Sequence, residues 1–287
     1  MSIAFLNGAF LPLQDASVPV MDRGFLFGDG VYEVIPVYAG KLFRLDQHLK
    51  RLGNSLAAIR IENPLSSADW QSMLNELVSR NAEPEQAVYL QVTRGVAAKR
   101  DHAFPPDCKP TVFAMSAAMP PPVDIDKISG ATAVTFPDIR WKLCNIKAIT
   151  LLPNVMLRQQ AIDAGAAEAI LIREGYAVEG AASNLFIVKD GMLITPPNSP
   201  TLLPGVTRDL IIELAANHAV AFREADISEA ELFSADEIWL SSSTREISPV
   251  TLLDETVISH GKPGPVWKHM ISLYQDCKSA IRRGEAD

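Results

Sequence analysis

The chain has 287 residues, of which 48% are hydrophobic and 21% are charged. This composition is typical of a folded globular protein, and the length is enough for two domains with a substantial core. The 26 basic and 34 acidic residues give a net charge of −8, which argues against a general binder of nucleic acids or of anionic membranes. A small anionic ligand is not excluded, because it needs only a local basic pocket.

The cysteines and histidines further restrict the disulfides and metal sites that the protein could contain. Cys108, Cys144 and Cys277 lie far apart and form no C-x-x-C pair, which argues against a disulfide framework and favours a reducing compartment. The five histidines lack metal-ligand spacing, so no metal site is predicted. No apolar run approaches ~18 residues and the start is not basic, so no membrane span or signal peptide is predicted. A cytoplasmic protein is expected.

The first part of the chain mixes predicted strands and helices. Asn7 and Gly8 form a strong hairpin signal between two apolar segments. Leucines recur on one face of the segment 46–59, which predicts a helix with Asp46 as its cap. The other elements expected here are strands at 3–6, 9–13, 31–38, 87–93 and 111–117, and a helix from Ser66 or Ser67 through Leu77.

Three consecutive prolines at 120–122 predict a stiff connector, because they fit neither a helix nor a central strand. We therefore expect an N-terminal α/β domain over 1–119, a linker over 120–124 and a C-terminal domain over 125–287 that carries Lys147; a long surface loop within one domain is the alternative. Beyond the prolines the elements alternate irregularly, which favours an α+β fold over a doubly wound sheet. They are strands at 131–136, 169–173, 184–188, 192–194 and 237–240, and helices at 151–164, 206–218 and 265–282.

Several catalytic motifs are absent from the sequence. It contains no G-x-G-x-x-G, no G-x-x-x-x-G-K-[ST], no H-E-x-x-H and no G-x-S-x-G. Hydride transfer on a standard Rossmann domain, P-loop phosphoryl transfer, zinc hydrolysis and α/β-hydrolase chemistry are therefore disfavoured.

Two ionisable residues are candidates for chemistry. Lys147 lies in the largely apolar run LCNIKAITLL and is either a surface residue or a desolvated amine that can attack a carbonyl and form a Schiff base. Glu179 lies at the end of a predicted strand next to a glycine, where its carboxylate could hold a protonated ring nitrogen. An exposed turn residue is the ordinary alternative for Glu179.

A possible phosphate site is the third feature. The segment 203–208, LPGVTR, leads into a predicted helix whose first N–H groups and dipole favour an anion, and Thr207 adds a hydroxyl. The run SSST at 241–244 follows a predicted strand, and Arg51 could supply a full charge. Singly, these are a helix cap, a polar loop and a solvated arginine. Together with a lysine and a carboxylate, they are the groups that pyridoxal 5′-phosphate requires.

The motifs resemble those of fold-type IV pyridoxal-phosphate enzymes, in the family's order. The resemblance implies an α+β protein with a smaller N-terminal α/β sandwich, a larger C-terminal pseudo-barrel and the cofactor between the domains. It implies that Lys147 forms the Schiff base and moves a proton, that Glu179 keeps the ring nitrogen protonated, and that Leu203 packs against the ring. Arg51, Val206, Thr207 and Ser243 would bind phosphate, with Ser242 nearby. The matching segments are DRGFLFGDGVYE at 22–33, HLKRL at 48–52, EGAASN at 179–184, LPGVTR at 203–208 and STREI at 243–247.

Within this family, the segments YEVIPVY at 32–38, VTRG at 92–95 and RDH at 100–102 are like those of D-amino-acid aminotransferases. Residues i and i+2 of an extended loop point the same way, so Arg100 and His102 could grip one carboxylate while Tyr32 closes the third side. The resemblance implies ping-pong transfer from D-amino acids to 2-oxo acids such as 2-oxoglutarate or pyruvate. It also implies a homodimer in which this loop completes the partner's active site.

Two departures from the family pattern and several alternatives remain. Ala181 and Ala182 replace a serine-rich stretch, which removes two hydroxyls near the cofactor, and the loop before Arg100 is one residue longer. A branched-chain L-amino-acid transaminase, an (R)-amine transaminase or an aminodeoxychorismate lyase would share the cofactor residues. A non-enzymatic cofactor binder or a structural dimer is a further alternative. The pair of Arg100 and His102 favours D-amino acids.

Overall fold

A computed structural model describes residues 2–120 and 124–285 and divides the chain into two compact units. Unit 1 comprises Met1–Pro121, Ile146–Thr150 and Ala280–Asp287, and unit 2 comprises Pro122–Asn145 and Leu151–Ser279. Residues 121–123 of the expected linker lie outside the described residues, so the division at 120–124 stays a proposal. The segment Ile146–Thr150 belongs with unit 1, because Ala148 pairs with Val31 there. This pairing joins distant parts of the sequence, so a single division point along the chain cannot predict it.

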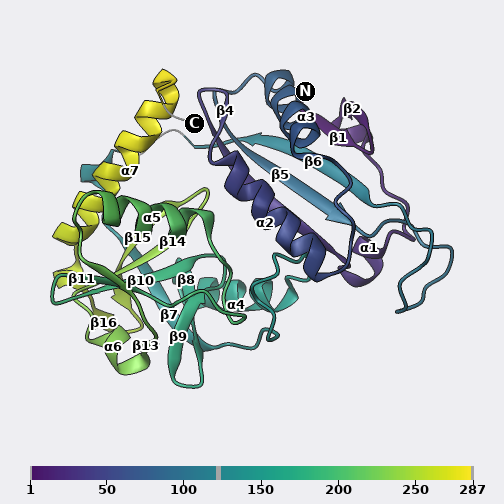
Figure 1. Ribbon diagram of the computed structural model, residues 1–287. Coiled ribbons are helices and arrows are strands. Elements are labelled where there is room, and N and C mark those ends of the chain that lie inside the picture. Colours follow the sequence, from purple (N-terminus) through teal and green to yellow (C-terminus); the bar gives the residue numbers. More distant parts are fainter. Residues whose placement is uncertain (1, 121–123, 286–287) are drawn as a thin grey trace. The chain divides into compact units, whose positions relative to one another are not determined.

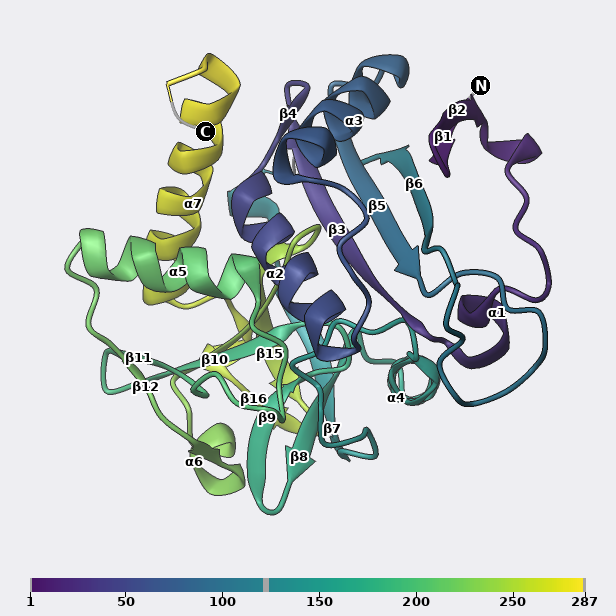
Figure 2. The ribbon, with the colours of Figure 1, turned by 45° about the vertical axis from the view of Figure 1, so that its right-hand side comes forward.

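Unit 1 is built on a six-stranded sheet in the order β2-β1-β6-β5-β3-β4, with every neighbouring pair antiparallel (Figures 1 and 2). The predicted hairpin at Asn7 and Gly8 is confirmed, and both residues have the positive φ that its tight turn requires. The strands are β1 Ile3–Leu6, β2 Ala9–Pro12, β3 Gly30–Tyr38, β4 Lys41–Leu42, β5 Glu85–Thr93 and β6 Thr111–Ala118.

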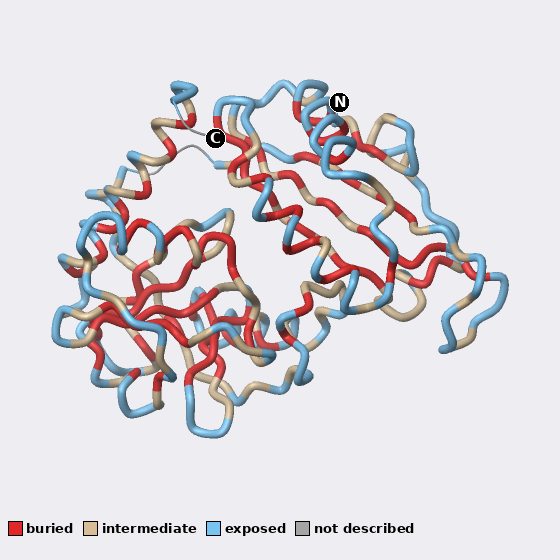
Figure 3. The backbone as a smooth tube through the Cα atoms, in the orientation of Figure 1, coloured by how far each residue is buried: buried red, intermediate tan, exposed pale blue. Residues whose placement is uncertain are grey.

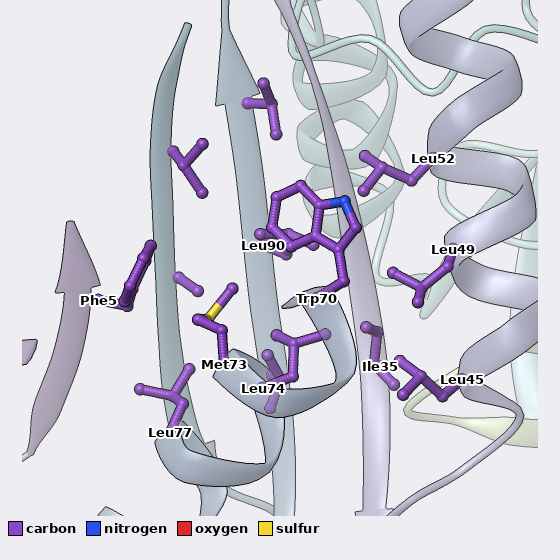
Figure 4. Packing of buried hydrophobic residues seen from close by; sticks show 14 of the residues in the cluster. Phe5, Ile35, Leu45, Leu49, Leu52, Trp70, Met73, Leu74, Leu77 and Leu90 are labelled. Carbon is purple, nitrogen blue, oxygen red and sulfur yellow. The ribbon is translucent and has the colours of Figure 1, made fainter. Parts of the chain in front are cut away.

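Two helices, α2 (Leu45–Ala58) and α3 (Ser67–Arg80), bury their apolar stripes against this sheet. Figure 4 shows leucines of α2 and the large Trp70 of α3 directed toward the strands. Helix α3 begins after Ser66 as predicted, because the Ser66 hydroxyl accepts a hydrogen bond from the Asp69 N–H at 3.2 Å. The expected cap of α2 is wrong: Arg44 holds the N-cap position and Asp46 lies in the first turn, where its charge faces the positive end of the dipole.

Unit 2 is built on a ten-stranded sheet whose central strands close on themselves. The order β10-β14-β15-β7-β8-β9 is completed by a pairing of β9 with β10 at Glu179 and Asn184. Figure 3 shows buried positions running along these strands. This barrel-like sheet confirms the expected α+β class with a C-terminal pseudo-barrel. The strands are β7 Ala131–Pro137, β8 Glu168–Arg173, β9 Tyr176–Gly180, β10 Asn184–Lys189, β11 Met192–Thr195, β12 Phe222–Glu224, β13 Ile227–Ser228, β14 Glu237–Ser242, β15 Glu246–Leu253 and β16 Thr256–Val257.

The remaining helices complete the two units. In unit 2, α4 packs on β7 and β8, and α5 packs on β14. None of the helices in the described residues is long and apolar enough to cross a membrane. Their bounds are η1 Leu13–Asp15 and α1 Arg23–Phe27 in unit 1, η2 Ile125–Lys127, α4 Leu152–Asp163, α5 Val206–Asn217, α6 Glu229–Phe233 and η3 Ser259–Gly261 in unit 2, and α7 Pro265–Arg283, which begins in unit 2 and ends in unit 1.

Candidate functional site

Lys147 lies in unit 1, beside the start of β3 and against α2. Its backbone N–H donates to the Ser55 hydroxyl at 3.2 Å, and its carbonyl accepts from the Tyr32 N–H at 3.0 Å. Its Nζ lies 4.0 Å from the centroid of the Tyr32 ring. The structure therefore places the candidate amine against the tyrosine that the sequence assigned to the substrate carboxylate.

A buried ionic cluster lies on the same side of α2. Both Glu33 oxygens accept hydrogen bonds from Arg51, from Nε at 2.8 Å and from Nη2 at 2.7 Å, and Oε2 also contacts Nδ1 of His48 at 2.7 Å. Burial alone would raise the pKa of Glu33, but the charge and hydrogen bonds of Arg51, with His48, outweigh burial and lower this pKa to about 2. Glu33 is therefore ionised, and it fixes the orientation of the Arg51 guanidinium.

His48 belongs to this cluster as a neutral ring. Burial lowers the pKa of His48, the Glu33 carboxylate opposes that effect, and the positive charges of Arg51 and Lys147 lower the pKa further. Because its neighbour is a carboxylate acceptor, we assign the ring proton to Nδ1. His48 and Glu33 both lie inside segments that resemble family motifs, but the sequence alone indicated no role for either residue.

Tyr32 is held by a row of aromatic rings from three adjacent strands. The Tyr32 and Tyr89 rings stack with centroids 5.7 Å apart, and Tyr89 meets Phe113 at 6.5 Å. The Tyr89 hydroxyl donates to Oε1 of Gln91 at 2.7 Å. Burial, with the nearby Tyr32, raises the pKa of Tyr89 to about 12, so Tyr89 stays a neutral donor that supports Tyr32.

Arg100 and His102 are both exposed, and one aromatic ring of unit 1 contacts both. The Arg100 guanidinium lies 5.0 Å from the centroid of Phe27, and the His102 ring lies 5.3 Å from the same ring. The two residues that the sequence predicted as a carboxylate clamp thus share a contact with Phe27, and their grip on a carboxylate stays a prediction.

Glu179 lies in unit 2, where β9 meets β10. Its Oε1 accepts a hydrogen bond from Nη1 of Arg140, and its Oε2 accepts from the Leu203 N–H at 3.1 Å and from Nδ2 of Asn184 at 3.3 Å. Burial raises the pKa of Glu179, and Arg140 and the Leu203 N–H only partly offset this effect. The carboxylate is thus fully buried, fixed by three donors and positioned by the closure of the barrel.

Arg140 extends the hydrogen-bond network of Glu179, although it lies outside every motif found in the sequence. Nη2 of Arg140 pairs with Asp138 at 2.9 Å, and Arg173 pairs with the same carboxylate at 2.8 Å. Burial alone would lower the pKa of Arg140, but Asp138 and Glu179 outweigh burial and raise it. Arg140 is therefore a permanent cation beside Glu179. Asp138 and Arg140 follow β7, whereas Arg173 lies in β8 and Glu179 in β9, so no local pattern in the sequence joins the four residues.

The start of α5 lies in unit 2 and carries the segment that the sequence predicted for phosphate binding. Gly205 is its N-cap, and a Cβ at this position would lie 1.9 Å from Oδ1 of Asn184, so only glycine fits there. Val206 and Thr207 form the buried first turn, whose N–H groups lack helical partners. Ser241, which pairs with Asn184 across β10 and β14, has a buried Oγ with no hydrogen-bond partner among the described residues.

The serines differ from one another in this region. Ser242 and Ser243 are both half-buried. The Oγ of Ser242 accepts a hydrogen bond from the Arg245 N–H at 3.3 Å and so stabilises its own turn. Ser241, named from the sequence only as part of the run 241–244, is the serine whose buried hydroxyl has no hydrogen-bond partner among the described residues. Since an unpartnered buried hydroxyl is costly, this oxygen and the α5 N–H groups fit a ligand with several anionic oxygens such as a phosphate.

Comparisons with known proteins agree on one family. The model of the family described as amino-transferase class IV matches residues 30–253. A D-alanine aminotransferase of Bacillus licheniformis is 40% identical over 96% of this chain and 96% of its own, and one of Staphylococcus haemolyticus is 36% identical over 94% and 95%. The solved T.th. branched-chain amino acid aminotransferase with pyridoxamine 5′-phosphate has a TM-score of 0.90 and 26% identity over 99% and 96%. The Escherichia coli branched-chain enzyme has a TM-score of 0.87 and 27% identity over 100% and 96%.

Proposed function

The chain belongs to the class IV aminotransferase family, and from this premise we propose that it is a pyridoxal-phosphate-dependent transaminase that moves the amino group of a D-amino acid to a 2-oxo acid. The observation that carries the proposal is the near-full-length similarity to D-alanine aminotransferases. The loop with Arg100 and His102, which contact one aromatic ring, supports it. D-Alanine and D-glutamate are the donors we expect, with pyruvate and 2-oxoglutarate as acceptors.

The chain's own residues fit the cofactor. The N–H groups of Val206 and Thr207 and the orphaned Ser241 hydroxyl would take the phosphate, with Ser242 and Ser243 in the adjoining turn. Arg51, oriented by Glu33, would add the positive charge that a phosphate dianion requires. Leu203, whose N–H is bonded to Glu179, would pack against the ring.

Lys147 and Glu179 have different tasks in the reaction. When bound, pyridoxal 5′-phosphate supplies a carbonyl for the amine and a ring that withdraws electrons. Nζ of Lys147 would remove the proton from the substrate Cα and deliver it to C4′ of the cofactor. Glu179 would accept a charge-assisted hydrogen bond from the protonated ring nitrogen, and the positive charge of Arg140 favours the ionised form of the Glu179 carboxyl that this requires.

We propose a homodimer in which the loop with Arg100 and His102 completes the partner's site. Exposed apolar side chains support an interface: Leu152, Val155 and Met156 share one face of α4 in unit 2. Light scattering should give the mass of two chains. Placement in the cytoplasm is likewise a proposal, and it rests on the odd number of cysteines.

A half-reaction screen tests the proposed function. The purified protein, loaded with pyridoxal 5′-phosphate, is mixed with D-alanine, D-glutamate, L-leucine or (R)-1-phenylethylamine, and the cofactor spectrum and the new 2-oxo acid are followed. We expect rapid conversion with D-alanine and little with L-leucine. Faster conversion of L-leucine would assign the chain to the branched-chain class, and faster conversion of (R)-1-phenylethylamine to acetophenone would assign it to the (R)-amine class.

Replacing Arg100 tests the carboxylate clamp. Arg100→Ala should raise KM for D-alanine about 10- to 100-fold, because a charged hydrogen bond to a carboxylate contributes roughly 1.5–3 kcal/mol. Cofactor occupancy, measured from the bound absorbance, should stay at the wild-type level. Lys99→Ala, which removes an exposed neighbouring charge, is the control. An unchanged KM for D-alanine in Arg100→Ala would remove Arg100 from the clamp.

A further inference from the structure

We infer that Arg23 is a positioning residue that holds the loop between β5 and β6 in the shape that lets Arg100 and His102 grip a substrate carboxylate. This inference rests on the proposed function and extends it to a residue that touches neither substrate nor cofactor. Arg23 begins α1 and is 3% exposed, whereas the two clamp residues are exposed on the loop.

One guanidinium binds three consecutive loop carbonyls. Nη1 of Arg23 donates to the carbonyl oxygens of Asp101 at 2.5 Å and Ala103 at 3.3 Å, and Nη2 donates to that of His102 at 3.3 Å. The planar fork of arginine has fixed donor directions, so the three peptide planes cannot turn independently. Because the peptide planes on both sides of His102 are set, the direction of its side chain is set as well.

Arg23 is itself anchored to helix α2. Its Nε donates to Oδ2 of Asp29 at 2.7 Å, and Arg94 grips the same carboxylate through Nε at 2.8 Å and Nη2 at 3.0 Å. Arg94 also donates to the carbonyls of Ile59 at 2.7 Å and Arg60 at 3.1 Å, at the C-terminal end of α2. The loop is thus tied through two arginines and one carboxylate to a packed helix.

Helix α1 also contacts the start and the side chains of the loop. The Arg23 N–H donates to the Gly95 carbonyl at 2.9 Å, and Gly95 has a φ of +100°, a conformation that favours glycine. Phe27, one turn along α1, contacts both Arg100 and His102. Figure 2 shows the loop between β5 and β6 running beside α1. The backbone and the side chains of the clamp are therefore fixed by the same short helix.

The variant Arg23→Gln in the holoenzyme tests the inference, because it keeps a donor but loses the fork and the charge. We expect KM for D-alanine to rise about 10- to 100-fold while kcat changes less than about threefold, since misplacing a substrate-positioning group weakens carboxylate binding. Tryptic cleavage after Lys99 and Arg100 should accelerate, which reports release of the loop without any turnover. Arg80→Gln, which breaks an exposed pair with Glu76 on α3, should change neither measurement.

A double variant separates positioning from general damage. In an Arg100→Ala background, Arg23→Gln should raise KM less than in the wild type, because the charged one of the two residues that it positions is already gone. A KM that rises in Arg100→Ala but not in Arg23→Gln would overturn the inference and leave the clamp intact. If neither variant raises KM, both the clamp and the inference fail. Should Arg23→Gln not fold, Phe27→Leu must raise KM for D-alanine, and an unchanged KM there would overturn the inference.

Discussion

Lys147→Ala should abolish transamination, with a fall in kcat of at least ~10⁴-fold, because a single amine serves as both nucleophile and proton carrier. The visible absorbance that pyridoxal 5′-phosphate acquires when joined to a lysine should also be lost. The measurements are the half-reaction rate with D-alanine and the absorbance spectrum of the purified variant. Lys50→Ala on the exposed side of α2 removes a cation from the same unit and should behave as the wild type.

Two further variants identify what Lys147 contributes. Lys147→Arg keeps the positive charge near Tyr32 but cannot attack a carbonyl, so it should be as inactive as Lys147→Ala. Added methylamine should restore part of the rate in Lys147→Ala, because it supplies the missing amine, and should restore none in Lys147→Arg, where the side chain fills the space. Full turnover in Lys147→Ala would refute the assignment of this residue.

The sequence was sufficient to recognise the family and to propose Lys147 as the reactive lysine, but not to predict the surroundings of this lysine. Its neighbours in unit 1 come from distant positions, joined by the bridge between Val31 and Ala148 and by the Ser55 hydroxyl. Such pairings depend on tertiary register, which local periodicity does not encode. The motif therefore led to Lys147 as the proposed reactive residue, whereas its contact with Tyr32 required the fold.

The strand β15 and the arginines that support the site show the same limit. Pro249 disfavours a strand in the sequence, yet β15 forms because it pairs with β14 on one side and β7 on the other. Arg23 lies within a recognised motif, but its partners are loop carbonyls, which every residue type has. Arg140 lies outside all motifs and meets Glu179 only in the folded unit. Hydrogen bonds to backbone carbonyls and ion pairs between distant residues produce no recognisable local pattern in the sequence.

Glu33→Gln should strongly destabilise unit 1. It leaves the Arg51 guanidinium buried without its anionic partner, a type of change that costs about 3–5 kcal/mol. Urea unfolding followed by tryptophan fluorescence measures the loss. Glu76→Gln is the matched control, because the same substitution there breaks only an exposed pair with Arg80, which contributes about 0.5 kcal/mol or less.

The pH dependence of this loss separates charge from packing. The pKa of Glu33 is about 2 in the folded protein against roughly 4.3 in an unfolded chain, so ionised Glu33 stabilises the fold above pH ~4.3, by about 3 kcal/mol. This stabilisation disappears as the pH falls through ~4 toward ~2. The difference in unfolding free energy between wild type and Glu33→Gln should therefore shrink over that range. The raised pKa of Glu179 acts in the opposite direction, but it is common to both proteins and cancels in the difference.

The same variant connects stability to the cofactor. If Glu33 orients Arg51 for a phosphate, Glu33→Gln should weaken the binding of pyridoxal 5′-phosphate at pH 7, where the fold of the variant still persists. Titration of the apoenzyme with the cofactor measures this, and Glu76→Gln again serves as the control. A difference in stability that stays constant from pH 7 to pH 3 would show that Glu33 acts through packing. Unchanged cofactor affinity would then assign Arg51 to the fold of unit 1 and not to the phosphate.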